Sequence, residues 1–122
     1  MDLQDLRTAL AEFVDQREWR QFHTPKNLAM ALAGEAGELV TLFQWLTPEE
    51  AEAIMEDPQI ATQVRHEIDD VLSYLIRLAD VLDIDLAAAL QDKIRLNEQH
   101  YPVHLARGTA DKYDRLPVDG DC

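Results

Sequence analysis

Apolar residues repeat through residues 60 to 82 at the spacing of an α-helix, and they occupy more than one side of it. One stripe consists of Val64, Ile68, Val71, Leu75, Leu78 and Leu82. Leu72, Ile76 and Ala79 add apolar positions beside that stripe. A helix that is apolar on nearly all sides is buried on nearly all sides. A chain of 122 residues cannot easily cover such a helix alone, so the pattern predicts self-association through helices.

Three other long helices are predicted, and no segment shows the alternation that is typical of a strand. They cover residues 2 to 18, residues 24 to 46, and a segment from Asp83 or Asp85 to about residue 99. Thr24 followed by Pro25 is a start signal for the second of these helices. The fold class is therefore all-α, a bundle of four main helices whose core is completed by homo-oligomerisation.

The remaining segments are short or poor in apolar residues. Thr47 is a predicted N-cap, Glu50 completes a capping box, and Pro58 is expected to end the short helix that follows. Residues 106–122 contain two glycines and few apolar side chains. We therefore expect one helical domain over residues 1–105 and an extended arm or flexible tail over residues 106–122.

The charge balance excludes several classes of protein. Acidic residues number 24 and basic residues 11, which gives a formal net charge of −13. Such a chain is not expected to coat nucleic acid or to adhere to an anionic membrane, because both need a basic face. The single cysteine, Cys122, allows no disulfide within the chain, and the N-terminus is not expected to be a signal peptide, because it lacks a basic segment and an apolar segment. These features predict a cytoplasmic protein, and an acidic protein can still bind polyphosphates if metal cations bridge the two.

Two pairs of carboxylates stand on different helices at the margins of apolar stripes. Glu35 and Glu38 form one pair, and Glu67 and Asp70 form the other. Residues three apart share a helix face, so each pair presents two acidic groups to one side. One such pair is usually a solvated face. Because two pairs both border apolar stripes, two interpretations are about equally supported: solvated helix faces, or a single site that the four carboxylates share.

A shared site of four carboxylates needs cations, because the acidic groups otherwise repel one another or take up protons. Carboxylate oxygens are the ligands that Mg²⁺ prefers, with Mn²⁺ as a substitute. His66 is expected to be a surface residue. The Glu-x-x-His signature of di-iron bundles is absent from the sequence, which argues against redox chemistry.

The spacing of these pairs also resembles a known motif. Glu35-x-x-Glu38, followed after 28 residues by Glu67-x-x-Asp70, is similar to the metal motif of the all-α nucleoside triphosphate pyrophosphohydrolases, the MazG-like group. The flanking stretches "REWRQFHTPKNLAMALAGEAGELVTLFQW" and "EIDDVLSYLIRLADVLDIDL" resemble its dCTP pyrophosphatase branch, and the likeness runs from about residue 12 to 107. The resemblance implies dimers or dimers of dimers that use Mg²⁺ to cleave the α–β bond of a nucleoside triphosphate.

The resemblance also implies roles for individual residues. The metal ligands are Glu35, Glu38, Glu67 and Asp70, with Glu38 and Glu35 as the catalytic glutamates. The substrate-binding residues are Trp19, His23 and Trp45 around the base, Lys93 and Asn97 at the phosphates, and Asn27, Tyr74 and Tyr101. From spacing alone, Trp45 lies two turns after Glu38 on the same helix face, where a base can stack on it. A core tryptophan is the alternative interpretation.

Two other functions compete with a dCTP pyrophosphatase. One is a related bundle enzyme of different specificity, such as a dUTP or phosphoribosyl-ATP pyrophosphatase. The other is a non-catalytic helical binding module whose acidic face recognises a protein. The sequence contains no Walker A glycine loop, so phosphate is not expected to lie in that kind of backbone cradle.

Overall fold

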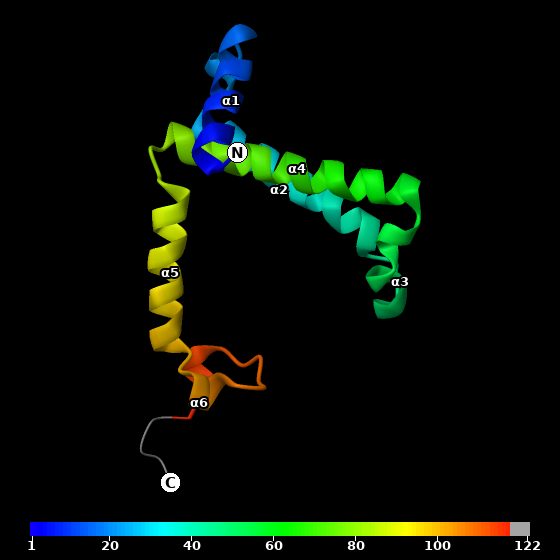
Figure 1. Cartoon of the computed structure of the whole chain (residues 1–122), viewed down its shortest axis with the longest axis vertical. Coiled ribbons are helices and arrows are strands. Elements are labelled where there is room, and N and C mark those ends of the chain that lie inside the picture. The colour runs from blue at the N-terminus through cyan, green and yellow to red at the C-terminus, as the bar shows by residue number, and fades with distance from the viewer. Residues whose placement is uncertain (118–122) are drawn as a thin grey trace. The chain divides into compact units, whose positions relative to one another are not determined.

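The computed structural model describes residues 1–117, and all regular structure within them is helical (Figure 1). The elements are α1 (Leu3–Gln16), η1 (Arg20–Phe22), α2 (Pro25–Phe43), α3 (Pro48–Glu52), η2 (Ile54–Glu56), α4 (Pro58–Val81), α5 (Leu86–His100), α6 (Val103–Ala106) and η3 (Tyr113–Arg115), where η marks a 3₁₀ turn. The all-α prediction is confirmed. The chain divides into two compact units, Met1–Ile84 and a second that begins at Asp85, and each is described by itself.

Side-chain caps start the helices where the sequence predicts them. The Thr24 hydroxyl accepts a hydrogen bond from the Asn27 N–H at 3.3 Å, and a proline opens α2. Thr47 and Glu50 form the predicted capping box before α3. The prediction that Pro58 ends the short helix was wrong, because Pro58 is the first residue of α4 and follows an aspartate N-cap. A proline at the first helical position loses no hydrogen bond, so it begins a helix as readily as it ends one.

Helix α1 ends earlier than predicted because the chain turns at Glu18. This residue has the left-handed φ of 55°. The Glu18 N–H donates to the Asp15 carbonyl at 3.1 Å, and the Trp19 N–H donates to the Val14 carbonyl at 3.0 Å. These two bonds form a Schellman motif, which usually places glycine at this position. The turn brings Trp19 back against α1, where its ring meets the edge of Phe13 at a centroid distance of 5.8 Å.

Helix α4 is the centre of the first unit. It runs beside α2 along much of its length and also contacts α1 (Figure 1). The buried apolar residues of the described chain are Val14, Leu28, Ala61, Val64, Ile76 and Ala79. Within residues 1–117, no helix combines the length and the apolar character that a membrane span requires.

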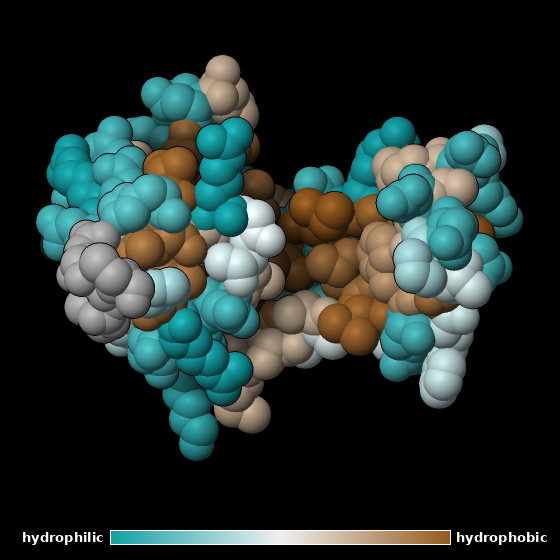
Figure 2. Space-filling model, turned by 90° about the horizontal axis from the view of Figure 1, so that it is seen from below, coloured by the Kyte–Doolittle hydropathy of each residue, from teal (hydrophilic) through white to brown (hydrophobic). Residues whose placement is uncertain are grey.

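Much of the predicted α4 stripe is not covered by this chain. Ile68 is 50% exposed, Leu75 38% and Leu82 48%. On α2, Met30 and Val40 are also exposed, and Figure 2 shows apolar surface over the part of the molecule that α2 and α4 occupy. The uncovered apolar area supports self-association through helices, which stays a prediction.

The second unit contains α5 and the segment that follows it. Asp85 caps α5 by accepting from the Ala88 N–H at 3.1 Å. The Tyr113 ring stacks on His100 at 4.2 Å and meets the edge of Tyr101 at 6.1 Å, so part of the predicted arm is held against the end of α5. Residues 118–122, including Cys122, lie outside the described chain. The domain boundary near residue 105 stays a prediction.

Candidate metal site and base pocket

Three of the four predicted metal ligands converge where α2 and α4 lie side by side. Glu35 and Glu38 project from α2 and Glu67 from α4. One carboxylate oxygen of each lies within 4.8 Å of the others. Glu35 and Glu67 are partly buried and Glu38 is exposed. The i, i+3 spacing on α2 therefore places one ligand in the helix interface and one at its solvent edge.

The electrostatics of Glu67 fit a cation site. Its Oε2 atom is buried and has no hydrogen-bond partner among the described residues. Burial of this carboxyl raises its pKa, and the neighbouring Glu35 carboxyl and the charges of Glu38 and Asp70 raise the pKa further. A buried oxygen without a partner beside two other carboxylates is satisfied by a divalent cation with oxygen ligands.

Asp70 is not part of this convergent group. It lies one turn further along α4, its side chain is exposed, and its charge acts on Glu67 from there. It lines a neighbouring cavity instead. The structure thus brings three predicted ligands together and places the fourth between the carboxylate group and that cavity.

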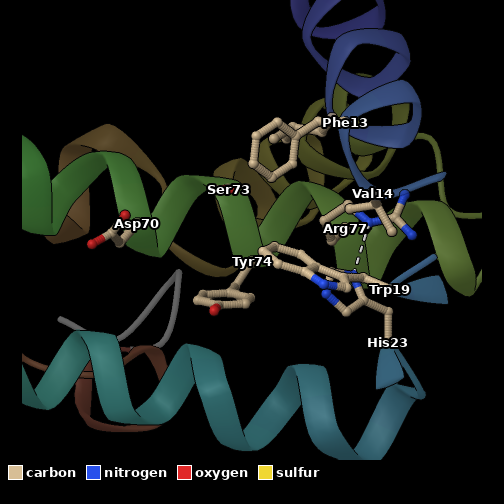
Figure 3. A pocket seen from close by; sticks show the side chains of 9 residues that line it. Phe13, Val14, Trp19, His23, Asp70, Ser73, Tyr74 and Arg77 are labelled. Carbon is tan, nitrogen blue, oxygen red and sulfur yellow. Dashed lines mark hydrogen bonds between the residues drawn. The ribbon is translucent and has the colours of Figure 1, made fainter. Parts of the chain in front are cut away.

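The cavity has a volume of about 130 Å³ and is built by α1, the turn after it, and α4 (Figure 3). Its lining comprises Leu10, Phe13, Val14, Trp19, His23, Asp70, Ser73, Tyr74 and Arg77. Three predicted substrate-binding residues, Trp19, His23 and Tyr74, share this one cavity. Aromatic rings around a small space next to the three carboxylates form a suitable pocket for a flat heterocycle.

Sequence reasoning missed Arg77, which lies in the cavity wall and is only 4% exposed. Its Nη1 donates to Asp80 Oδ2 at 2.8 Å, and its Nε donates to His23 Nδ1 at 3.3 Å. Arg7 of α1 binds the other oxygen of Asp80. The sequence does contain one signal, because an arginine and an aspartate three residues apart in an apolar helix can form a buried ion pair. The third member, Arg7, is 73 positions before Asp80, and no local pattern indicates it.

The surroundings of His23 disfavour its protonated form. Burial lowers its pKa, and the positive charge of Arg77 lowers the pKa further. Asn27, whose contact with substrate stays a prediction, donates from its side-chain amide to the Phe22 carbonyl at 3.1 Å. It closes the turn that carries His23, so its contribution to the pocket in this structure is to shape the loop.

Trp45 lies far from the other predicted base-binding residues. It follows the last residue of α2 by two positions and is 86% exposed, so it is not a core residue of the described chain. Trp19 and His23 precede the same helix. A helix of 19 residues is about 28 Å long, because each residue adds about 1.5 Å. One chain therefore cannot place Trp19 and Trp45 around a single base.

The other predicted substrate-binding residues belong to the second unit. Lys93 and Asn97 are exposed on α5, and Tyr101 follows its last residue and is partly buried. Their predicted contacts with phosphate stay predictions.

An all-helical fold that gathers glutamates on two adjacent helices beside an aromatic pocket defines the class of all-α pyrophosphohydrolases that act on nucleotides. Residues 31–116 match the MazG-like family. The chain belongs to this family.

Individual relatives agree with this assignment. The chain is 46% identical over 115 residues to dCTP pyrophosphatase 1 of Rattus norvegicus and 44% identical over the same length to dCTP pyrophosphatase 1 of Homo sapiens. Each match covers 94% of this chain and 68% of the relative. A solved pyrophosphatase from Archaeoglobus fulgidus has a TM-score of 0.73 at 40% identity, covering 81% of this chain and 91% of that one.

Proposed function

We propose that the protein is a Mg²⁺-dependent nucleoside triphosphate pyrophosphohydrolase that cleaves the α–β bond of dCTP or a modified dCTP to the monophosphate and pyrophosphate. The observation that carries the proposal is the convergence of Glu35, Glu38 and Glu67 around a buried oxygen without a partner. Relatives named dCTP pyrophosphatase support the choice of substrate. A cytoplasmic location is part of the proposal.

The chain's own acidic residues bind the metal and prepare the attacking water. Glu35, Glu38 and Glu67 would hold Mg²⁺, and Asp70, one turn further along α4, is the proposed fourth ligand. When bound, the ion neutralises charge, polarises the phosphoryl group and lowers the pKa of a coordinated water. Glu38 is the exposed member of the group, so it is the carboxylate best placed to orient or deprotonate water that arrives from solvent, with Glu35 beside it.

The cavity beside the carboxylates receives the base. Trp19 and Tyr74 supply ring surfaces against which a base can stack, at about 1–3 kcal/mol per base. His23 supplies a polar group for the base edge. Lys93, Asn97 and Tyr101 complete the proposed substrate-binding set, and a lysine is the point charge that a polyphosphate attracts.

Self-association explains how Trp45 can take part. Since the two ends of α2 are about 28 Å apart, Trp45 reaches a pocket that contains Trp19 only if a second copy supplies it. We therefore propose a homodimer or a dimer of dimers, with each base pocket formed by Trp19 of one copy and Trp45 of another. The exposed apolar surface of α2 and α4 supports this assembly.

Pyrophosphate release from a panel of nucleoside triphosphates tests the activity. We expect Mg²⁺-dependent release that is fastest with dCTP, stops in EDTA and is lost in Glu38→Gln. Glu56→Gln, at an exposed glutamate outside the group, is the matched control and should keep full activity. A preference for dUTP or phosphoribosyl-ATP would establish the related enzyme, and no release from any nucleotide would establish the binding module.

Subunit mixing tests the shared pocket. Trp19→Ala and Trp45→Ala should each raise KM when present in every copy. Mixed oligomers of the two variants contain pockets in which both tryptophans are intact, so part of the activity at low substrate concentration should return. If mixing restores nothing although hybrid oligomers form, the two tryptophans do not share a pocket across copies.

A further inference from the structure

The contact between Arg77 and His23 determines which nitrogen of the imidazole carries hydrogen. The Arg77 Nε lies 3.3 Å from His23 Nδ1 (Figure 3). A guanidinium group has five N–H donors and no acceptor. The Nδ1 atom must therefore offer a lone pair, which leaves the ring neutral with its hydrogen on Nε2. In this tautomer, Nε2–H is the only hydrogen-bond donor of the His23 side chain.

Arg77 is fixed from its other end, so it cannot easily turn away from His23. Its Nη1 donates to Asp80 at 2.8 Å, and the same carboxylate binds Arg7 on α1. The Arg77 side chain is only 5% exposed, so water does not compete well for its donors. Burial of His23 and the positive charge of the adjacent Arg77 both oppose protonation of the ring, in agreement with its lowered pKa.

We propose that Arg77 is a positioning residue for base selection, because it fixes His23 as a donor-only group in the wall of the pocket. The proposal rests on the proposed function, in which the base enters the cavity that His23 and Arg77 line. A fixed hydrogen-bond donor favours bases that have an acceptor atom at the facing position. Cytosine carries a lone pair at N3, whereas uracil and thymine carry a hydrogen there, so a donor facing this atom favours cytosine.

The preference for cytosine over uracil follows from the match between hydrogen-bond donors and acceptors at His23. A histidine that can exchange its two tautomers offers either a donor or an acceptor and therefore tolerates both kinds of base edge. A histidine held by a buried arginine cannot adapt, and a base with N–H at the contact leaves two donors facing each other. Pockets with fixed polar groups reject the wrong ligand because those groups are left unpaired.

The tautomer can be measured without any substrate. Long-range ¹H–¹⁵N correlation spectra of the full chain at pH 7, with His23 assigned by a His23→Gln variant, should show hydrogen on Nε2. In Arg77→Met the spectrum should change to a mixture of tautomers, and the His23 pKa should rise. Arg95→Met, which removes an exposed arginine that pairs with Asp92, is the matched control and should leave the His23 signals unchanged.

A His23 ring in the native chain that carries hydrogen on Nδ1, or is protonated at pH 7, would overturn the inference. This measurement needs no substituted protein apart from the assignment variant, so it decides the question even if Arg77→Met does not fold. An Arg77→Met variant that folds and keeps the native His23 spectrum would overturn the inference equally.

Kinetics then test the consequence for substrate choice. The ratio of kcat/KM for dCTP to that for dUTP should fall about fivefold to tenfold in Arg77→Met, the size expected when one hydrogen bond is lost. Arg95→Met should keep the native ratio. Equal losses for both nucleotides would show that Arg77 only supports the fold. Failure of the native protein to hydrolyse any nucleotide would remove the proposed function but leave the tautomer result standing.

Discussion

Asp80 is the residue whose replacement should most affect the stability of the first unit. Asp80→Asn removes the negative charge that Arg77 and Arg7 share. The Arg77 side chain is 5% exposed, the Asp80 side chain 21% and the Arg7 side chain 32%. Removing one partner of a fully buried ion pair typically destabilises a protein by about 3–5 kcal/mol. Because Arg7 can regain water and only Arg77 is fully enclosed, we expect a loss of about 2–3 kcal/mol.

The chain contains a matched control for this substitution. Asp92 pairs with Arg95 at 2.9 Å, and these two residues are also three positions apart on a helix. Their side chains are 76% and 69% exposed, so this pair is solvated where Arg77 and Asp80 are shielded, and the Asp80 carboxylate also binds a second arginine, Arg7. Exposed pairs contribute about 0–1 kcal/mol, and Asp92→Asn should therefore cost at most about 0.5 kcal/mol.

Thermal unfolding followed by circular dichroism measures both effects. For a chain of this length, 1 kcal/mol corresponds to roughly 3–5 °C in Tm. Asp80→Asn should therefore lower Tm by roughly 6–15 °C, and Asp92→Asn by roughly 2 °C or less. Protein concentration must be equal in all samples, because Tm of an oligomer depends on it. Equal Tm values for the two variants would refute the view that the shielded ion pairs of Asp80 contribute more to stability than an exposed pair.

Four other results are expected. The folded-state pKa of Glu67 lies above its ordinary value, so the stability of the Mg²⁺-free protein should fall as pH rises through that raised pKa. Melting temperatures measured across pH should show this fall in the native protein and not in Glu67→Gln. Trp45→Ala should raise KM for dCTP more than it lowers kcat, and unchanged KM in steady-state kinetics contradicts this. Glu18→Gly should raise Tm by roughly 3–5 °C, because a φ of 55° costs a residue with a side chain about 1 kcal/mol. An unchanged Tm would show that the backbone at Glu18 is not strained. Light scattering should detect a dimer or tetramer, and a stable particle of 13.9 kDa contradicts this.

The positions of the helices could be predicted because their start signals are local. Thr24 and Asp85 cap their helices with side chains that reach backbone N–H groups three residues ahead. Pro58 was misinterpreted although Asp57 before it repeats the arrangement of Thr24 and Pro25. The end of α1 at Gln16 was missed because a glutamate occupies the left-handed position that glycine normally marks.

The site could be predicted only in part, because spacing determines which residues share a helix face but not where that face meets another helix. The i, i+3 rule identified Glu67 and Asp70 as neighbours, yet only Glu67 lies in the contact between α4 and α2. The contact of Arg77 with His23 joins residues 54 positions apart, and no local pattern indicates it. Trp45 was placed on the face of Glu38 by extending α2 beyond Phe43, where the helix actually ends.

The order of residues along α4 explains how one helix can serve both halves of the site. Glu67, Asp70, Tyr74 and Arg77 follow one another at intervals of three, four and three residues, so they form a single stripe. The stripe begins at the carboxylate group and ends in the wall of the aromatic cavity. Ten residues of helix span about 15 Å, so the two ends of the stripe are well separated. In the proposed function, a substrate along this stripe would have its phosphates near Glu67 and its base near Arg77. Metal binding and base selection would then lie at different points of one helix, and we expect substitutions to alter them independently.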